Sequence, residues 1–98
     1  MPSIADYFNG IASRTGFSST AITSLVGGAP SLPRLQLLAE VVDAVAGSYT
    51  QEGVRMWFAR ARRPLEGKSP KEVLQQPNWQ PSDAGPQEVL RMARSLLS

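Results

Sequence analysis

Few residues of this 98-residue chain have side chains suited to chemistry. It contains no Cys and no His, which excludes thiol nucleophiles, cysteine zinc sites and imidazole bases. Glu40 and Asp43 are three residues apart, so on a helix they would share one face, where paired carboxylates can hold a metal ion or transfer a proton. Because no further acid lies nearby, we expect them to form the solvated edge of a helix. The sequence predicts no enzyme, no metal and no cofactor.

The basic residues are stronger candidates for a functional surface. Residues 55–71 contain six cations against Glu66 alone, a local charge of +5, whereas the rest of the chain carries −3. Such a cluster could contact phosphates with a salt-dependent affinity, meet an acidic protein surface, or cover the solvated side of a helix. The sequence leaves these three interpretations open. The cluster consists of Arg55, Arg60, Arg62, Arg63, Lys68 and Lys71.

Trp79 is a candidate contact in a loop flanked by Pro77 and Pro81. The indole could fold back as a lid on the core. Exposed, it would be a rigid anchor for a partner, because tryptophan is enriched among the residues that dominate binding energy. The sequence does not decide between lid and anchor.

The elements that position these side chains are predicted to be helices. Apolar residues recur at helical spacing, and Ser or Thr stands where an N-cap is needed. The predicted helices are Ile4 to about Arg14, a short helix after Ser18, 32–46 after Ser31, a helix from Thr50 to Pro64, a short helix that starts at the capping box Ser69–Glu72, and a last helix from Pro86. In the helix from Thr50 to Pro64, the side chains expected inward are Val54, Trp57, Phe58 and Ala61. Residues 75–85 are predicted to form a loop.

The segment 32–46 is apolar around more than half of its circumference, which is typical of a central helix. This stripe could be buried within the chain or across a homodimer. In the next helix, Arg55, Arg60, Arg62 and Arg63 are expected to project away from the apolar stripe.

No segment alternates with period two, so we predict an all-α fold, a single compact domain of five or six helices. Residues 1–47 hold the N-terminal helices and 48–98 complete the same domain. No stretch approaches the roughly 20 apolar residues that span a bilayer, and the N-terminus lacks the features of a signal peptide. A cytoplasmic protein with no membrane contact is expected.

Residues 16–27 resemble the first helix of a helix-turn-helix unit. The polar recognition helix that should follow, and whose side chains would reach base edges, is replaced by the apolar segment 32–46. The helix-turn-helix is therefore degenerate, and nucleic acid is a weakly supported partner.

Four short motifs carry a family resemblance: the Trp-Phe pair at 57–58, Leu-Glu-Gly at 65–67, the proline-opened helix at 69–74 and Val-Leu-Arg-Met-Ala-Arg at 89–94. Together they resemble the toxin-binding domain of Xre/MbcA/ParS-type antitoxins, over roughly residues 16–98. The motif positions have mostly architectural roles, since aromatic rings fill the core and glycine permits a turn.

The resemblance implies a bacterial antitoxin that neutralises a RES-domain, NAD-degrading toxin by direct occlusion. It implies contacts from the last helix and tail: Arg91, Arg94, Leu97 and Ser98. The chain departs from the family in lacking a recognition helix and in ending directly after the last helix. The alternatives are a small DNA-binding regulator and an antitoxin-fold adaptor repurposed in another bacterial or phage system.

Overall fold

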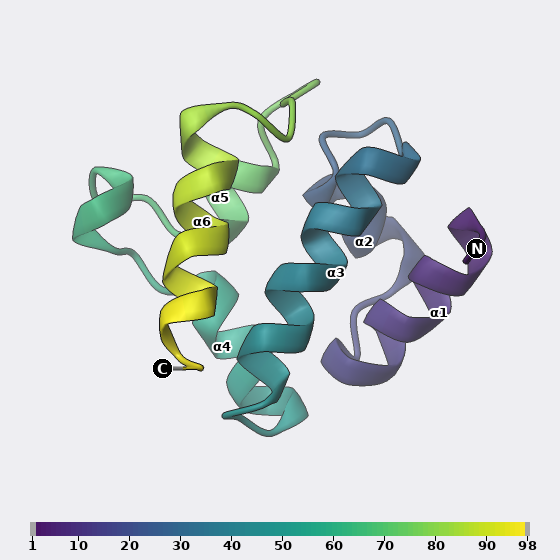
Figure 1. Ribbon diagram of the computed structural model, residues 1–98, viewed down its shortest axis with the longest axis horizontal. Helices are drawn as coiled ribbons and strands as arrows, with labels where there is room; N and C mark the ends of the chain where they lie inside the picture. The colour runs from purple at the N-terminus through teal and green to yellow at the C-terminus, as the bar shows by residue number, and fades with distance from the viewer. Residues whose placement is uncertain (1, 98) are drawn as a thin grey trace.

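The computed structural model describes residues 2–97, and within this range it consists of helices and the loops that join them, with no strand (Figure 1). The all-α, single-domain prediction is confirmed. In the described part of the chain, no helix is long and apolar enough to cross a membrane. The elements are α1 (Ile4–Thr15), α2 (Ser19–Leu25), α3 (Leu32–Ala46), α4 (Gln51–Ala59), the 3₁₀ turn η1 (Arg63–Leu65), α5 (Pro70–Leu74) and α6 (Ala84–Ser95).

Five helices begin where a serine or threonine predicts a start. At each of these N-caps the side-chain oxygen accepts a hydrogen bond from the backbone N–H three residues further on, which satisfies a donor without a partner inside the helix. The residues are Ser3, Ser18, Ser31, Thr50 and Ser69. At α5 the Glu72 carboxylate also accepts from the Ser69 backbone N–H (3.2 Å), so the predicted capping box is confirmed.

Helix α3 is the centre of the molecule, with α1 on one side and α6 on the other (Figure 1). Its side chains Leu35, Leu38, Val41 and Val45 are each 0% exposed. The apolar stripe predicted from the sequence is thus buried within the chain. The N-terminal and C-terminal halves share one core through this helix.

Helix α4 ends at Ala59, earlier than the predicted end at Pro64, and Ala61 is exposed rather than inward. Residues 62–68 then form a closed loop. The Arg62 N–H donates to the Lys68 carbonyl and the Gly67 N–H to the Arg62 carbonyl, both at 3.0 Å. Glu66 (φ 58°) and Gly67 (φ 83°) are both left-handed, which reverses the chain. This 62–68 loop stands out from the body of the molecule (Figure 1).

Helix α6 begins at Ala84, two residues before the predicted start at Pro86. Asp83 precedes the helix, but its carboxylate accepts from the Gln80 N–H (2.8 Å) and makes no cap hydrogen bond. Proline is tolerated in the first turn because the N–H it lacks would have no helical partner there. The predicted 75–85 loop is therefore wrong at its end, where residues 84 and 85 are helical.

Candidate functional site

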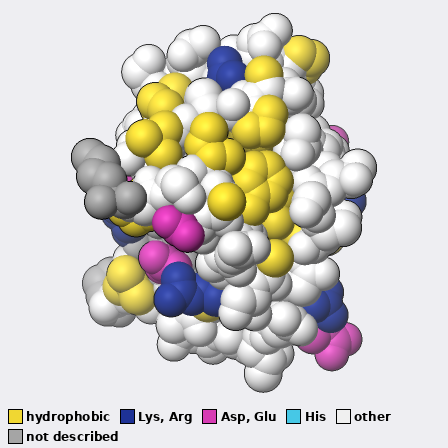
Figure 2. All heavy atoms as spheres, turned by 90° about the vertical axis from the view of Figure 1, so that its right-hand side faces the viewer, with side chains coloured by type: hydrophobic (Ala, Val, Ile, Leu, Met, Phe, Trp, Pro, Cys, Tyr) yellow, Lys and Arg dark blue, Asp and Glu magenta, His cyan; other side chains and the backbone are white. Residues whose placement is uncertain are grey.

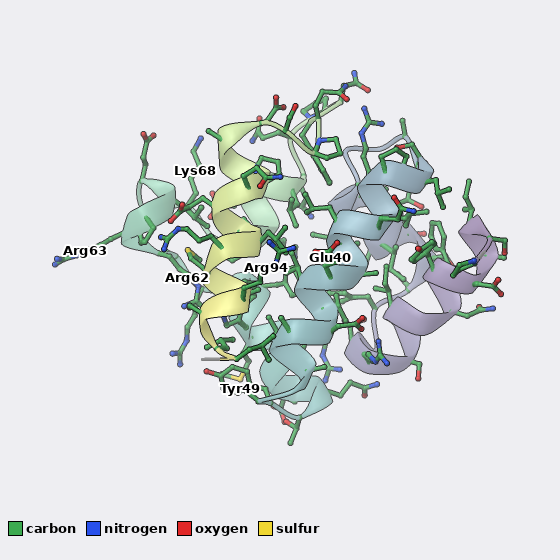
Figure 3. The ribbon with its side chains drawn as sticks, viewed as in Figure 1. Glu40, Tyr49, Arg62, Arg63, Lys68 and Arg94 are labelled. Carbon is green, nitrogen blue, oxygen red and sulfur yellow. The ribbon has the colours of Figure 1, made fainter. Side chains whose placement is uncertain are left out.

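The acidic residues Glu40 and Asp43 each pair with an arginine of another helix. Glu40 Oε2 lies 2.6 Å from Arg94 Nη2 of α6 (Figure 3), and Asp43 pairs with Arg14 of α1. Both carboxylates are more than half exposed. Within residues 2–97, no three His, Cys, Asp or Glu side chains are grouped so that they could hold a metal ion. The two acids instead link the central helix to its neighbours.

The predicted basic cluster is divided by the fold. Arg55 was expected to project away from the molecule, but it does not. Its Nη1 donates to the Thr15 carbonyl (2.8 Å) at the end of α1. The last carbonyls of a helix lack partners within it, and a cation is favourable there. Arg55 therefore caps the C-terminal end of α1.

Arg62 also departs from the outward position expected for it. Its guanidinium lies 4.8 Å from the ring centroid of Trp57, and Nη2 donates to the Trp57 carbonyl (3.1 Å). Nε is buried and has no hydrogen-bond partner among the described residues. Burial lowers the pKa of Arg62, an effect that Tyr49 partly opposes. The arginine is thus a partly desolvated cation held on an aromatic ring.

The remaining cations of the cluster, Arg60, Arg63, Lys68 and Lys71, are exposed. Arg63 extends away from the 62–68 loop (Figure 3). Lys71 lies on α5, whereas Arg55 lies on α4 and Arg60 directly follows that helix. The six basic residues thus belong to several elements and do not act as one patch.

Two depressions of about 370 and 260 Å³ meet at Trp57 and Arg62, and we call them the basic hollows. Among the residues that the structure describes, no Asp or Glu lines either of them. Tyr49 and Met56, which line the smaller one, are 46% and 51% exposed. The larger is lined by Trp57, Ala61, Arg62, Arg63, Pro64, Met92, Ser95 and Leu96, and the smaller by Tyr49, Gly53, Met56, Trp57, Arg60 and Arg62.

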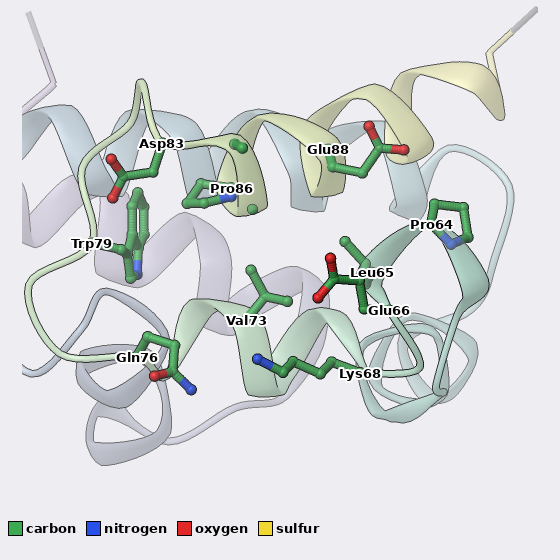
Figure 4. A pocket seen from close by; sticks show the side chains of 12 residues that line it. Pro64, Leu65, Glu66, Lys68, Val73, Gln76, Trp79, Asp83, Pro86 and Glu88 are labelled. Atoms are coloured by element: carbon green, nitrogen blue, oxygen red, sulfur yellow. The ribbon is translucent and has the colours of Figure 1, made fainter.

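A third depression, of about 450 Å³, lies on the other side of the 62–68 loop, between α5 and the start of α6 (Figure 4). Its charged lining consists of three acids, Glu66, Asp83 and Glu88, and one cation, Lys68. We call it the acidic hollow. Its apolar lining includes Leu65, Val73, Trp79 and Pro86.

Trp79 is the lid and not the exposed anchor. Its side chain is 4% exposed, and Nε1 donates to the carbonyls of Leu74 (2.7 Å) and Leu25 (3.3 Å). Arg34 Nε donates to the Trp79 carbonyl (2.7 Å) and fixes the loop from the α3 side. This role of Arg34 was not predicted from the sequence, since a lone arginine in a first helical turn carries no signal of its distant partner.

The residues for which the resemblance implies contacts lie on α6 and directly after it. Arg91 binds Glu88 with two nitrogens, one of them Nε at 2.9 Å from Oε2, and Arg94 pairs with Glu40. Leu97 is 65% exposed. Ser98 lies outside the described residues. A depression of about 330 Å³ beside these arginines includes Leu90.

The opposite side of the molecule, which carries α1, presents apolar side chains to solvent (Figure 2). Ile4 is 45% exposed, and Phe8 and Ala12 are half-buried on the same helix. Ile4, Phe8 and Ala12 follow at four-residue spacing, so they form one stripe along α1.

The exposure of Tyr49 and Met56 was also not predicted from the sequence. Met56 stands on the polar side of α4, where an apolar side chain is a usable signal. Tyr49 is half-exposed and lies against Gly53. A Cβ on Gly53 would stand 2.9 Å from that of Tyr49, so glycine permits this close contact.

Comparison with models of protein families, with curated proteins and with solved structures finds no match for this chain. The resemblance to antitoxins therefore rests on the motif residues alone. Of these, Trp57, Phe58 and Leu65 are buried, and Gly67 adopts the positive φ of a left-handed turn. Their positions fit the architectural roles expected for them.

Proposed function

We propose that this chain is an antitoxin-like binding protein that neutralises a RES-type, NAD-degrading toxin by covering its surface. The motifs at 57–74 and 89–94 support the family, and the exposed outer face of α6 supports the mode of action. The proposal assigns the chain binding and no catalysis, and it places the chain in the cytoplasm with its target.

The exposed arginines of α6 are the observation that carries the proposal. The side chains of Arg91 and Arg94 are 65% and 62% exposed, and each is held by one carboxylate. Exposed ion pairs contribute only about 0–1 kcal/mol, so exchanging Glu88 or Glu40 for a carboxylate of a partner costs little. Leu97 adds an exposed apolar contact at the end of the same helix.

Co-expression with the product of the adjacent reading frame tests the proposal. We expect a stable complex with a RES-domain toxin and restored growth of the host. Arg91→Glu with Arg94→Glu should weaken the complex by at least about tenfold, since a hydrogen bond to a charged group contributes about 1.5–3 kcal/mol. The double variant should then fail to protect the host.

Arg14→Glu is the matched control, because Arg14 is another exposed arginine that pairs with an acid of α3. It should protect as the unchanged chain does, and circular dichroism should show that all variants are folded. Full protection by the double variant would overturn the assignment to α6. A stable complex with a neighbouring protein that has no RES domain would instead indicate an adaptor in another bacterial or phage system.

A further inference from the structure

The basic hollows lie on a surface that Arg91 and Arg94 do not line. We propose that these hollows bind an acidic segment of a partner protein, with a carboxylate at Arg62 and an apolar side chain beside Trp57. This inference concerns a separate surface and does not rest on the proposed function.

The charge of the lining selects an acidic segment. Arg60, Arg62 and Arg63 are the charged residues among those of residues 2–97 that line the two hollows, so a carboxylate entering there meets positive charge from this lining. A lysine or arginine of a partner would be repelled, because like charges placed together in an interface cost several kcal/mol, on the order of a hundredfold in affinity. The nearest acid on the loop, Glu66, lines the acidic hollow instead.

The Arg62 side chain is already held in one position, which favours binding of a carboxylate. Its guanidinium is stacked on Trp57 and held by one hydrogen bond to the Trp57 carbonyl, so little side-chain freedom is lost on binding. The burial of its Nε shows that the guanidinium is partly withdrawn from water. In such partly desolvated surroundings, a charge-assisted hydrogen bond is stronger than at an open surface.

The apolar part of the lining favours a protein segment over a nucleic acid. Tyr49 and Met56 are half-exposed at the smaller hollow, and Met92 and Leu96 line the larger one. Arginine, tyrosine, tryptophan and methionine are the residues enriched at protein interfaces. Contacts to nucleic acid go largely to phosphate and sugar and would leave the Met56, Met92 and Leu96 side chains in water.

The probe for the test is a short fluorescein-labelled peptide of glutamates around one phenylalanine, titrated with the full chain and followed by anisotropy. Three further probes separate the contributions: the same peptide with lysine for glutamate, the same peptide with serine for phenylalanine, and a short labelled oligothymidylate. We expect the acidic aromatic peptide to bind most tightly and the lysine peptide not to bind up to millimolar concentration.

Arg60→Glu with Arg63→Glu is the main variant, because both residues are exposed and the fold does not depend on them. It should weaken binding of the acidic peptide by at least about tenfold. Arg14→Glu with Lys71→Glu gives the same change of net charge away from the hollows, and it should leave the affinity within about twofold. Met56→Ser should weaken binding through the loss of apolar contact alone.

Three results would overturn the proposal. The first is that the acidic peptide fails to bind, or binds both double variants equally. The second is that the oligothymidylate binds more tightly than the peptide and depends on the same arginines. The third is that the unlabelled chain itself displaces the peptide and that Glu66→Lys abolishes this, which would show that the occupant is the acidic hollow of a second copy.

Discussion

The two sides of the 62–68 loop have opposite charge, although the segment that forms the loop is strongly basic. Pro64 lines both the larger basic hollow and the acidic hollow, so a single loop separates them. On one side the charged lining is three arginines, and on the other it is three acids and one lysine. The net charge of a sequence segment is therefore not the charge of the surface it borders.

The structure shows how the charges are distributed. Glu66 lies in a left-handed turn and lines the acidic hollow, where Asp83 and Glu88 join it. Helix α6 supplies both sides, with Glu88 at the acidic hollow and Met92 and Leu96 at the basic one. Substitutions of residues that support one side of the loop and not the other test this difference between the two sides.

The largest effect is expected at Trp79, which supports the acidic side. Trp79→Ala removes a 4%-exposed indole and the donor for two backbone carbonyls, so it should lower the free energy of unfolding by about 3–5 kcal/mol. Urea unfolding measures this. A loss under about 1 kcal/mol would show that Trp79 is not the lid of the core.

A smaller effect is expected at Gly27, which lies against the loop that carries Trp79. Its φ is +74°, and a Cβ there would stand 3.0 Å from two backbone atoms, Asn78 N and Gln76 O. Gly67, in the 62–68 loop, has φ +83° but open space around it. Gly67→Ala should cost about 1–2 kcal/mol of stability through backbone strain, and Gly27→Ala should cost more.

Thermal or urea unfolding of the two glycine variants gives the comparison directly. Gly10→Ala is the control, because Gly10 has no positive φ and nothing within 4 Å of an added Cβ; it should stabilise α1 slightly. If Gly67→Ala cost as much as Gly27→Ala, the close approach of the Trp79 loop to Gly27 would be contradicted.

On the basic side, Arg62→Met should lower the free energy of unfolding by only about 1 kcal/mol. The variant loses the contact with the Trp57 ring and the hydrogen bond to its carbonyl, but it also removes a buried donor without a partner. Arg63→Met, at an exposed site, should stay within about 0.5 kcal/mol. Equal losses in both variants would mean that Arg62 is not held on Trp57.

The smallest effect is expected at the border of the acidic hollow, where a hydrogen bond from Arg91 lowers the pKa of Glu88. The folded protein then holds this proton less tightly than the unfolded chain. The pair therefore contributes stability above the usual glutamate pKa, and the contribution is lost as the pH falls through the lowered value. Carboxyl NMR should show Glu88 titrating below the ordinary range, and Arg91→Gln should raise its pKa. An unchanged pKa in Arg91→Gln would contradict the pairing.

The helix starts could be predicted because a cap is a local interaction. Ser3, Ser18, Ser31, Thr50 and Ser69 act on N–H groups three residues away. The start of α6 was misplaced since Asp83 hydrogen-bonds backward to Gln80 and leaves no capping pattern of the usual kind.

The candidate site was less predictable because its geometry depends on residues far apart in the chain. Arg55 is turned to the end of α1 by a carbonyl 40 residues earlier. The left-handed backbone at Glu66 turns this residue away from its basic neighbours. The buried indole of Trp79 is held in place by hydrogen bonds to carbonyls of α2 and α5. The sequence shows that cations are numerous in 55–71 but not which side each one faces.

The difference between the two sides can be measured directly through the two tryptophans of the chain, since Trp57 lines the basic hollows and Trp79 the acidic one. Their indole N–H signals in a ¹⁵N NMR spectrum report the two surfaces separately. On addition of the acidic aromatic peptide, we expect the Trp57 signal to move with concentration and the Trp79 signal to stay in place. Movement of the Trp79 signal alone, or no movement of either signal, would contradict the account.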